Sequence, residues 1–127
     1  MLGELERDGR TVVADLEAGL GTTLRLKPGQ IDLVLVVVEP TPKSVEIGRR
    51  AVEAAREGAR VLVVANKVRG DDDVEAVRGA FPASELVVVP DDAAIARADR
   101  DGVAPIDLDP QAPGVRALVE LARLVGA

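Results

Sequence analysis

The chain has 127 residues, 47% of them hydrophobic and 30% charged, with a net charge of −6. This size suits one folded domain with its own core, and the negative charge argues against a nucleic-acid partner. Because the sequence contains no cysteine and no histidine, it excludes disulfides, thiol chemistry and imidazole catalysis, and we expect no zinc, nickel or haem. A hard ion such as Mg²⁺, held by carboxylate and water, stays possible.

The N-terminal segment Met1–Arg10 is polar and has the pattern of the end of a longer helix. It contains no basic stretch followed by an apolar one, so we predict no signal peptide. The longest apolar run, Leu33–Val38, is too short to span a bilayer. These features predict a cytoplasmic protein without a membrane span.

Thr11–Ala14 is a short apolar run that ends in Asp15, with Glu17 and Gly19 close behind. We interpret the run as a buried strand with Asp15 at its carboxyl tip. Ligands of open α/β sheets bind outside these tips, so this segment is a candidate site. The alternative is that Asp15 only begins a turn and helps to cap the next segment.

Ile31–Val38 is apolar without two-residue alternation, which is typical of a strand covered on both faces of a parallel sheet. Thr41 and Pro42 suit the cap and first position of a helix that ends before Gly58. The remaining predicted elements are strands over Val61–Ala65 and Leu86–Val89, helices after Asp71–Asp73, at Ala93 and at Pro113, and an extended linker over Gly102–Pro110. The alternation predicts one α/β domain over residues 1–127, with a three-layer α/β/α parallel sheet.

Two smaller predictions concern the helices. The three acids Asp71–Asp73 could suggest a cation site, but they suit a helix cap and first turn better, where the helix dipole favours negative charge. In the last helix the apolar spacing predicts a buried stripe. Its members are Val115, Leu118, Val119, Ala122 and Val125.

Polar residues come directly after each predicted strand, and the carboxyl ends of parallel strands share one edge of a sheet. The four groups are Asp15 and Glu17, Glu39 and Thr41, Asn66 and Lys67, and Asp91 and Asp92. Such an edge is where a nucleotide or another small ligand would bind.

Several of these segments resemble the ParA/MinD class of P-loop ATPases, in the order of that family. Asp15–Leu20 resembles its second nucleotide-sensing segment, most closely that of the CooC-type accessory ATPases of carbon monoxide dehydrogenase maturation. Val36–Ser44 resembles the family's next strand and helix start. Ala65–Arg69 resembles its base-contacting strand tip, and Val89–Asp99, together with Gly102, resembles the segment that closes over the adenine.

This resemblance implies a P-loop NTPase-like domain that binds ATP or ADP with Mg²⁺. Asp15 would lie near the Mg²⁺, through water, and Gly19 would offer its backbone N–H near the γ-phosphate.

On the base side, the resemblance implies that Asn66 hydrogen-bonds the adenine edge, with Lys67 beside it. Pro90 and Asp91 would line the base pocket. Guanine-specific relatives have Asp three residues after the Asn, whereas this chain has Arg69, which favours adenine.

Two features depart from the family. No Gly-rich loop ending in Gly-Lys-Ser or Gly-Lys-Thr is present, so the cradle for the β- and γ-phosphates is missing. CooC-type proteins use cysteines for nickel, which this chain lacks. We therefore expect the truncated, C-terminal portion of a MinD/ParA/CooC-type ATP-binding protein that does not hydrolyse ATP by itself.

The alternative function is a non-enzymatic α/β regulatory or interaction module that binds a protein partner. A phosphoacceptor receiver domain fits less well, because Asn66-Lys67 ends the third strand where that domain needs an Asp.

In the resembled family the phosphate-loop strand lies between the strands that match Thr11–Ala14 and Leu33–Val38. Without it these two strands could pair directly, or a second chain could cover the exposed edge. We favour self-association, or a chain that supplies the missing N-terminal half.

Overall fold

The computed structural model describes residues 9–16, 29 and 31–126. Its helices and strands are β1 (Leu33–Val38), α2 (Pro42–Arg56), β2 (Arg60–Val68), α3 (Asp71–Ala80), β3 (Glu85–Pro90), α4 (Ala93–Asp101), α5 (Pro105–Leu108) and α6 (Pro113–Leu124). In this described part no helix combines the length and the apolar character that crossing a bilayer requires.

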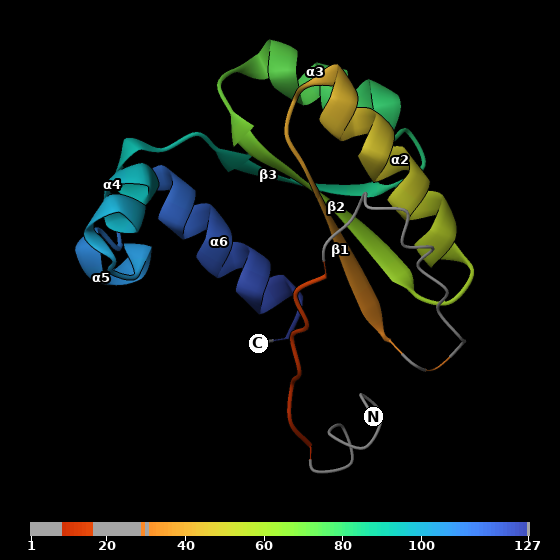
Figure 1. Cartoon of the computed structure of the whole chain (residues 1–127), viewed down its shortest axis with the longest axis horizontal. Coiled ribbons are helices and arrows are strands. Elements are labelled where there is room, and N and C mark those ends of the chain that lie inside the picture. Colours follow the sequence, from red (N-terminus) through yellow and green to blue (C-terminus); the bar gives the residue numbers. More distant parts are fainter. Residues whose placement is uncertain (1–8, 17–28, 30, 127) are drawn as a thin grey trace.

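The three strands form a parallel sheet in the order β1-β2-β3. Helices α2 and α3 lie on one face of this sheet and α6 lies on the other, while α4 and α5 pack beside the start of α6 (Figure 1). The predicted α/β class with three α/β/α layers and a parallel sheet is therefore confirmed.

Alternate residues of the strands build the larger part of the core. Val36 and Val38 of β1 and Val63 and Ala65 of β2 face α2 and α3, where they meet a cluster that includes Phe81. Because successive strand residues point to opposite faces, Leu62 and Val64 point to the face of the sheet on which α6 lies, and both are buried.

The linker predicted over Gly102–Pro110 is wrong, because this stretch contains the short helix α5. Gly102 ends α4 in the left-handed conformation, with φ of 66°. Pro105 then occupies the first position of α5, where its missing N–H costs no helical hydrogen bond.

The strand predicted over Thr11–Ala14 is also wrong. Residues 11–16 have no regular secondary structure, and the Val13 side chain is 82% exposed. An apolar run becomes a strand only when a neighbouring strand receives its hydrogen bonds, and the described sheet holds only β1, β2 and β3. Direct pairing of Thr11–Ala14 with Leu33–Val38 is therefore not formed.

Candidate functional site

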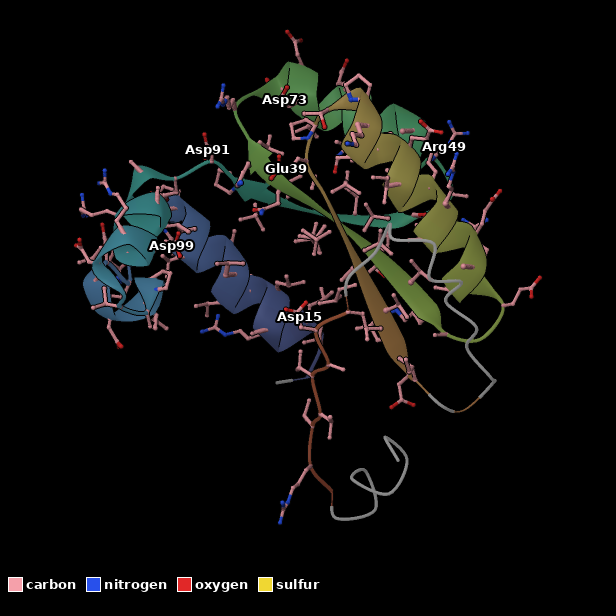
Figure 2. The ribbon with its side chains drawn as sticks, in the orientation of Figure 1. Asp15, Glu39, Arg49, Asp73, Asp91 and Asp99 are labelled. Carbon is pink, nitrogen blue, oxygen red and sulfur yellow. The ribbon has the colours of Figure 1, made fainter. Side chains whose placement is uncertain are left out.

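The carboxyl ends of the three strands meet at one edge of the sheet, as predicted. Val38 is level with Ala65, and Ala65 with Val88, so the residues just beyond these positions lie together. Glu39 and Asp91 lie at this end of the sheet (Figure 2). The candidate site is therefore built from the tips of β1, β2 and β3.

The tip of β2 is irregular at the two residues that the sequence singled out. Ala65 pairs with Val88 and Val68 pairs with Pro90, so β2 carries one more residue than β3 across Asn66 and Lys67. Lys67 has φ of 57°, in the left-handed region that residues other than glycine rarely adopt. Bulges of this kind redirect side chains and are frequent beside active sites. The β2 bulge, Asn66–Lys67, thus makes the tip of β2 a candidate ligand-binding position.

Asn66 offers the bulge's free hydrogen-bonding group. Its side chain is half-buried, and within the described part of the chain its amide has no hydrogen-bond partner. A side-chain amide carries both a donor and an acceptor, which is the combination that the edge of an adenine base requires. Asn66 therefore carries the hydrogen-bonding groups that a base edge requires, at the carboxyl end of the sheet.

Lys67 is held across the edge by Glu39. Its Nζ lies 2.9 Å from Glu39 Oε1, which joins the tips of β2 and β1. The hydrogen bond to Glu39 and the charge of that carboxylate raise the pKa of the Lys67 ammonium above its ordinary value. Lys67 therefore stays positively charged at neutral pH, close to any nucleotide bound at this edge.

Asp91 joins the tip of β3 to that of β2. Its N–H donates to the Val68 carbonyl at 2.9 Å, and its Oδ2 lies 3.3 Å from Nε of Arg69. The Arg69 N–H donates in turn to Asp73 Oδ2 at 2.9 Å. Arg69 thus presents a guanidinium to this edge, not the carboxylate that a guanine-specific site would need.

Asp92 is one of the two acids that the sequence places at the tip of β3, and the structure gives its side chain two hydrogen bonds. Its Oδ1 accepts the Ala94 N–H at 2.9 Å and caps α4, while its Oδ2 accepts the Gly114 N–H at 2.7 Å. These bonds, from Gly114 first and then Ala94, lower the pKa of the Asp92 carboxyl. An Asp just before a helix signals the cap, but no sequence signal reveals the bond to Gly114.

Asp15 does not lie with the other strand tips. It belongs to the exposed segment 9–16 and sits far from Glu39 and Asp91 (Figure 2). The prediction that four tips share one edge is wrong in this respect, because the strand that would carry Asp15 there is not formed. Gly19 and Glu17 lie outside the described residues, so the phosphate-side predictions stay predictions.

The described residues offer few side chains that could coordinate a metal ion together. Among the described residues no three acidic side chains come together in a group that could hold an ion. Asp71, Asp72 and Asp73 form the first turn of α3, with Gly70 as the cap residue. A shallow hollow of about 380 Å³ lies over Arg69–Asp73, next to the β2 bulge. These residues alone do not fit a resident Mg²⁺, whose remaining ligands would have to come from a nucleotide and water.

No family model matches this chain. The sequence is similar to an uncharacterized ATP-binding protein of Methanocaldococcus jannaschii, with 34% identity over 113 residues that cover 85% of this chain and 43% of that protein. The chain therefore spans less than half the length of the curated relative that it matches.

Two solved structures share its fold. The cell division ATPase MinD of Pyrococcus furiosus superposes with a TM-score of 0.62 and 23% identity, over 76% of this chain and 43% of that one. The MinD cell division protein of Aquifex aeolicus superposes with a TM-score of 0.56 and 22% sequence identity, over 77% of this chain and 45% of that one. The chain has the fold of the MinD ATPases, and the resemblance to the ParA/MinD superfamily is confirmed at the level of the fold.

Proposed function

We propose that this chain is the base-side part of a MinD/ParA-type ATP-binding domain spanning residues 1–127, and that it binds the adenine end of ATP or ADP. The observation that carries the proposal is the β2 bulge at the carboxyl edge of the sheet, where the Asn66 amide has no hydrogen-bond partner among the described residues. The similarity to an ATP-binding protein supports the same function. Lys67, Pro90 and Asp91 frame the base beside Asn66.

The phosphates are the part of the ligand that this chain holds poorly. No Gly-Lys-Ser or Gly-Lys-Thr loop occurs in the sequence, so no row of N–H groups and no lysine cradle the β- and γ-phosphates. For the Mg²⁺ and γ-phosphate side we propose Asp15, through water, and Gly19, which requires the segment that carries Asp15 to lie at the strand tips when a nucleotide is bound. We infer weak adenine-nucleotide binding and no ATP hydrolysis by this chain alone.

Within the superfamily we propose the CooC-type branch, on the segment Asp15–Leu20, without a nickel role. A cytoplasmic location belongs to the same proposal.

The test is calorimetric titration of the full chain with ADP and with GDP. We expect ADP to bind more tightly, and Asn66→Ala to weaken ADP binding by about 2-fold to 10-fold, the range for loss of one hydrogen bond. Gln111→Ala is the matched control, since it removes an exposed side-chain amide that makes no hydrogen bond within the described residues. Tighter GDP binding, or equal ADP affinity for the Asn66 and Gln111 variants, would contradict the assignment.

A second function, protein binding through the open side of the sheet, is favoured by a separate observation. Strand β1 is one of the two edge strands of the described sheet, and its Val37 side chain, on the face opposite α2, is 59% exposed. Leu118 and Leu124 of α6 are also exposed, at 40% and 47%. An apolar edge strand of this kind invites pairing with another chain. We propose a second copy as the occupant, with a chain that supplies the N-terminal half as the alternative.

A further inference from the structure

The carboxylate of Asp92 lies between the first turns of two helices and uses both of its oxygens. One accepts the Ala94 N–H at the start of α4, and the other accepts the Gly114 N–H at the start of α6. Capping α4 needs only the first of these bonds. The second joins residues 22 positions apart in the sequence, so it does something other than begin a helix.

The side chains of Ile95 and Asp92 lie too close to this bond to leave room for any side chain at position 114. A Cβ added to Gly114 would lie 2.7 Å from Ile95 Cδ1 and 2.8 Å from Asp92 Cβ. Real Cβ atoms do not approach other atoms so closely, so only glycine lets the first turn of α6 reach Asp92. We call this contact the Asp92–Gly114 joint.

The joint continues directly into the candidate site. Asp92 comes after Asp91, whose N–H donates to the Val68 carbonyl at 2.9 Å, just past the β2 bulge. Helix α6 also packs on β3, with Val115 buried. The tip of β3 is therefore fixed on one side by β2 and on the other by α6 through Asp92.

We propose that Asp92 is a positioning residue for the adenine-side loop: by holding the start of α6 against the start of α4, it sets Pro90 and Asp91 beside Asn66. The proposal rests on the proposed function for its consequence in nucleotide binding. Its structural part, the placement of Asp91 by the Asp92–Gly114 joint, does not depend on any ligand and can be tested without one.

Asp92→Asn separates this role from helix capping. Asparagine is as good a cap residue as aspartate, but its amide has one accepting oxygen and a nitrogen that only donates. It can therefore keep the bond from Ala94 while losing the bond from Gly114. Asp99→Asn is the matched control, because Asp99 is an exposed acid on the same helix whose side chain makes no hydrogen bond within the described residues.

The experiment measures amide hydrogen exchange by NMR and ADP affinity by calorimetry on the full chain, for both variants and for Gly114→Ala. We expect exchange at Gly114 to accelerate by about tenfold or more in Asp92→Asn, the size of a lost hydrogen bond to a charged group. Exchange at Asp91 should accelerate as well, because the tip of β3 is then held less firmly. Exchange at Ala94 should change little, and ADP affinity should fall by a similar factor. Gly114→Ala should reproduce the effect at Asp91 with the carboxylate intact, and Asp99→Asn should match the wild type.

Unchanged exchange at Asp91 in the folded Asp92 and Gly114 variants would overturn the proposal. So would faster exchange at Asp91 with ADP affinity at the wild-type value, because Asp92 would then be a structural cap alone. If Asp92→Asn does not fold, Gly114→Ala decides on the same readouts. A wild-type chain that binds no ADP would overturn the proposed function together with the nucleotide consequence, while exchange at Asp91 still decides the placement.

Discussion

Among single residues, two glycines mark where a helix backbone packs directly against side chains of a neighbouring element. Gly48 of α2 lies against β1, where an added Cβ would be 2.3 Å from Val38 Cγ1 and 3.2 Å from Phe81 Cζ. Gly114 plays the same part between α6 and α4. Gly79 of α3 is different, since an added Cβ there would meet nothing within 4 Å. Glycine is therefore required at two helical positions and dispensable at a third.

We expect Gly48→Ala to destabilise the fold by about 1–3 kcal/mol, because overpacking displaces core side chains. Gly79→Ala should instead stabilise it by about 0.5–1 kcal/mol, since alanine loses less backbone entropy in a helix. Urea unfolding of both variants measures the two changes in the free energy of unfolding. Equal effects at the two positions would show that α2 does not pack on β1 as described.

The ionisation of Asp92 gives a pH-dependent prediction. Its folded-state pKa is lowered by the N–H groups of Gly114 and Ala94, with Arg97 of α4 adding its positive charge. The stabilisation is therefore complete above the unfolded-state pKa, near pH 4, and is lost as the pH falls through the lower folded-state pKa. The difference in free energy of unfolding between the wild type and Asp92→Asn should be constant at neutral pH and shrink below about pH 4. Urea unfolding at a series of pH values measures it, and a difference that persists unchanged to about pH 2, below the usual Asp range, would contradict the assignment.

Among the helices and strands, local signals at the ends account for where the helices begin. The Thr41 side chain accepts the Ser44 N–H at 3.3 Å, and Pro42 occupies the first helical position of α2. The Glu39 N–H donates to Ser44 Oγ at 2.9 Å, which ties the end of β1 to the same turn. The start of α2 is thereby fixed beside the candidate site.

Thr41→Ala should destabilise the protein by about 1 kcal/mol through loss of the α2 cap. Thr41→Ser keeps the accepting hydroxyl and should stay within a few tenths of the wild-type value. Thermal or urea unfolding of the pair measures the difference. If alanine and serine behave alike, the hydroxyl of Thr41 does not stabilise the helix start.

Across the molecule as a whole, the sheet is covered unevenly. Helices α2 and α3 cover one face over β1 and β2, whereas α6 packs on β3 and leaves Val37 of β1 exposed (Figure 1). This open side, together with the unpaired edge of β1 in the described sheet, is where we propose that a second copy binds.

Val37→Lys should therefore reduce self-association, because a charge on the open face would have to be desolvated in the assembly. Val103→Lys is the control, since Val103 is a comparably exposed valine, at 45% against 59%, in the turn after α4. Sedimentation velocity over a range of concentrations measures the effect. A wild-type chain that stays a monomer of 13.3 kDa at high concentration would contradict self-association.

Local signals in the sequence predict the elements from Leu33 onward, apart from α5, together with their parallel arrangement. These signals include the continuous apolar runs, Thr41 and Pro42 at one helix start, and Pro113 at another. The structure has strands at the apolar runs and helices that begin at Pro42 and Pro113. The same signals place Asn66 and Asp91 at one edge, because parallel strands bring their carboxyl ends together.

Other features depend on residues distant in the chain, and these come from the tertiary structure. Thr11–Ala14 has a strand's composition but no partner in the described sheet, and Leu118 belongs to the predicted buried stripe of α6 but lies 40% exposed beside the open face. The β2 bulge depends on the register with β3, and the bond from Gly114 to Asp92 joins two helix starts. The apolar periodicity and the capping residues of a segment indicate which helix or strand it can form. Whether a strand pairs and whether a side chain is buried depend on the other segments that pack against it.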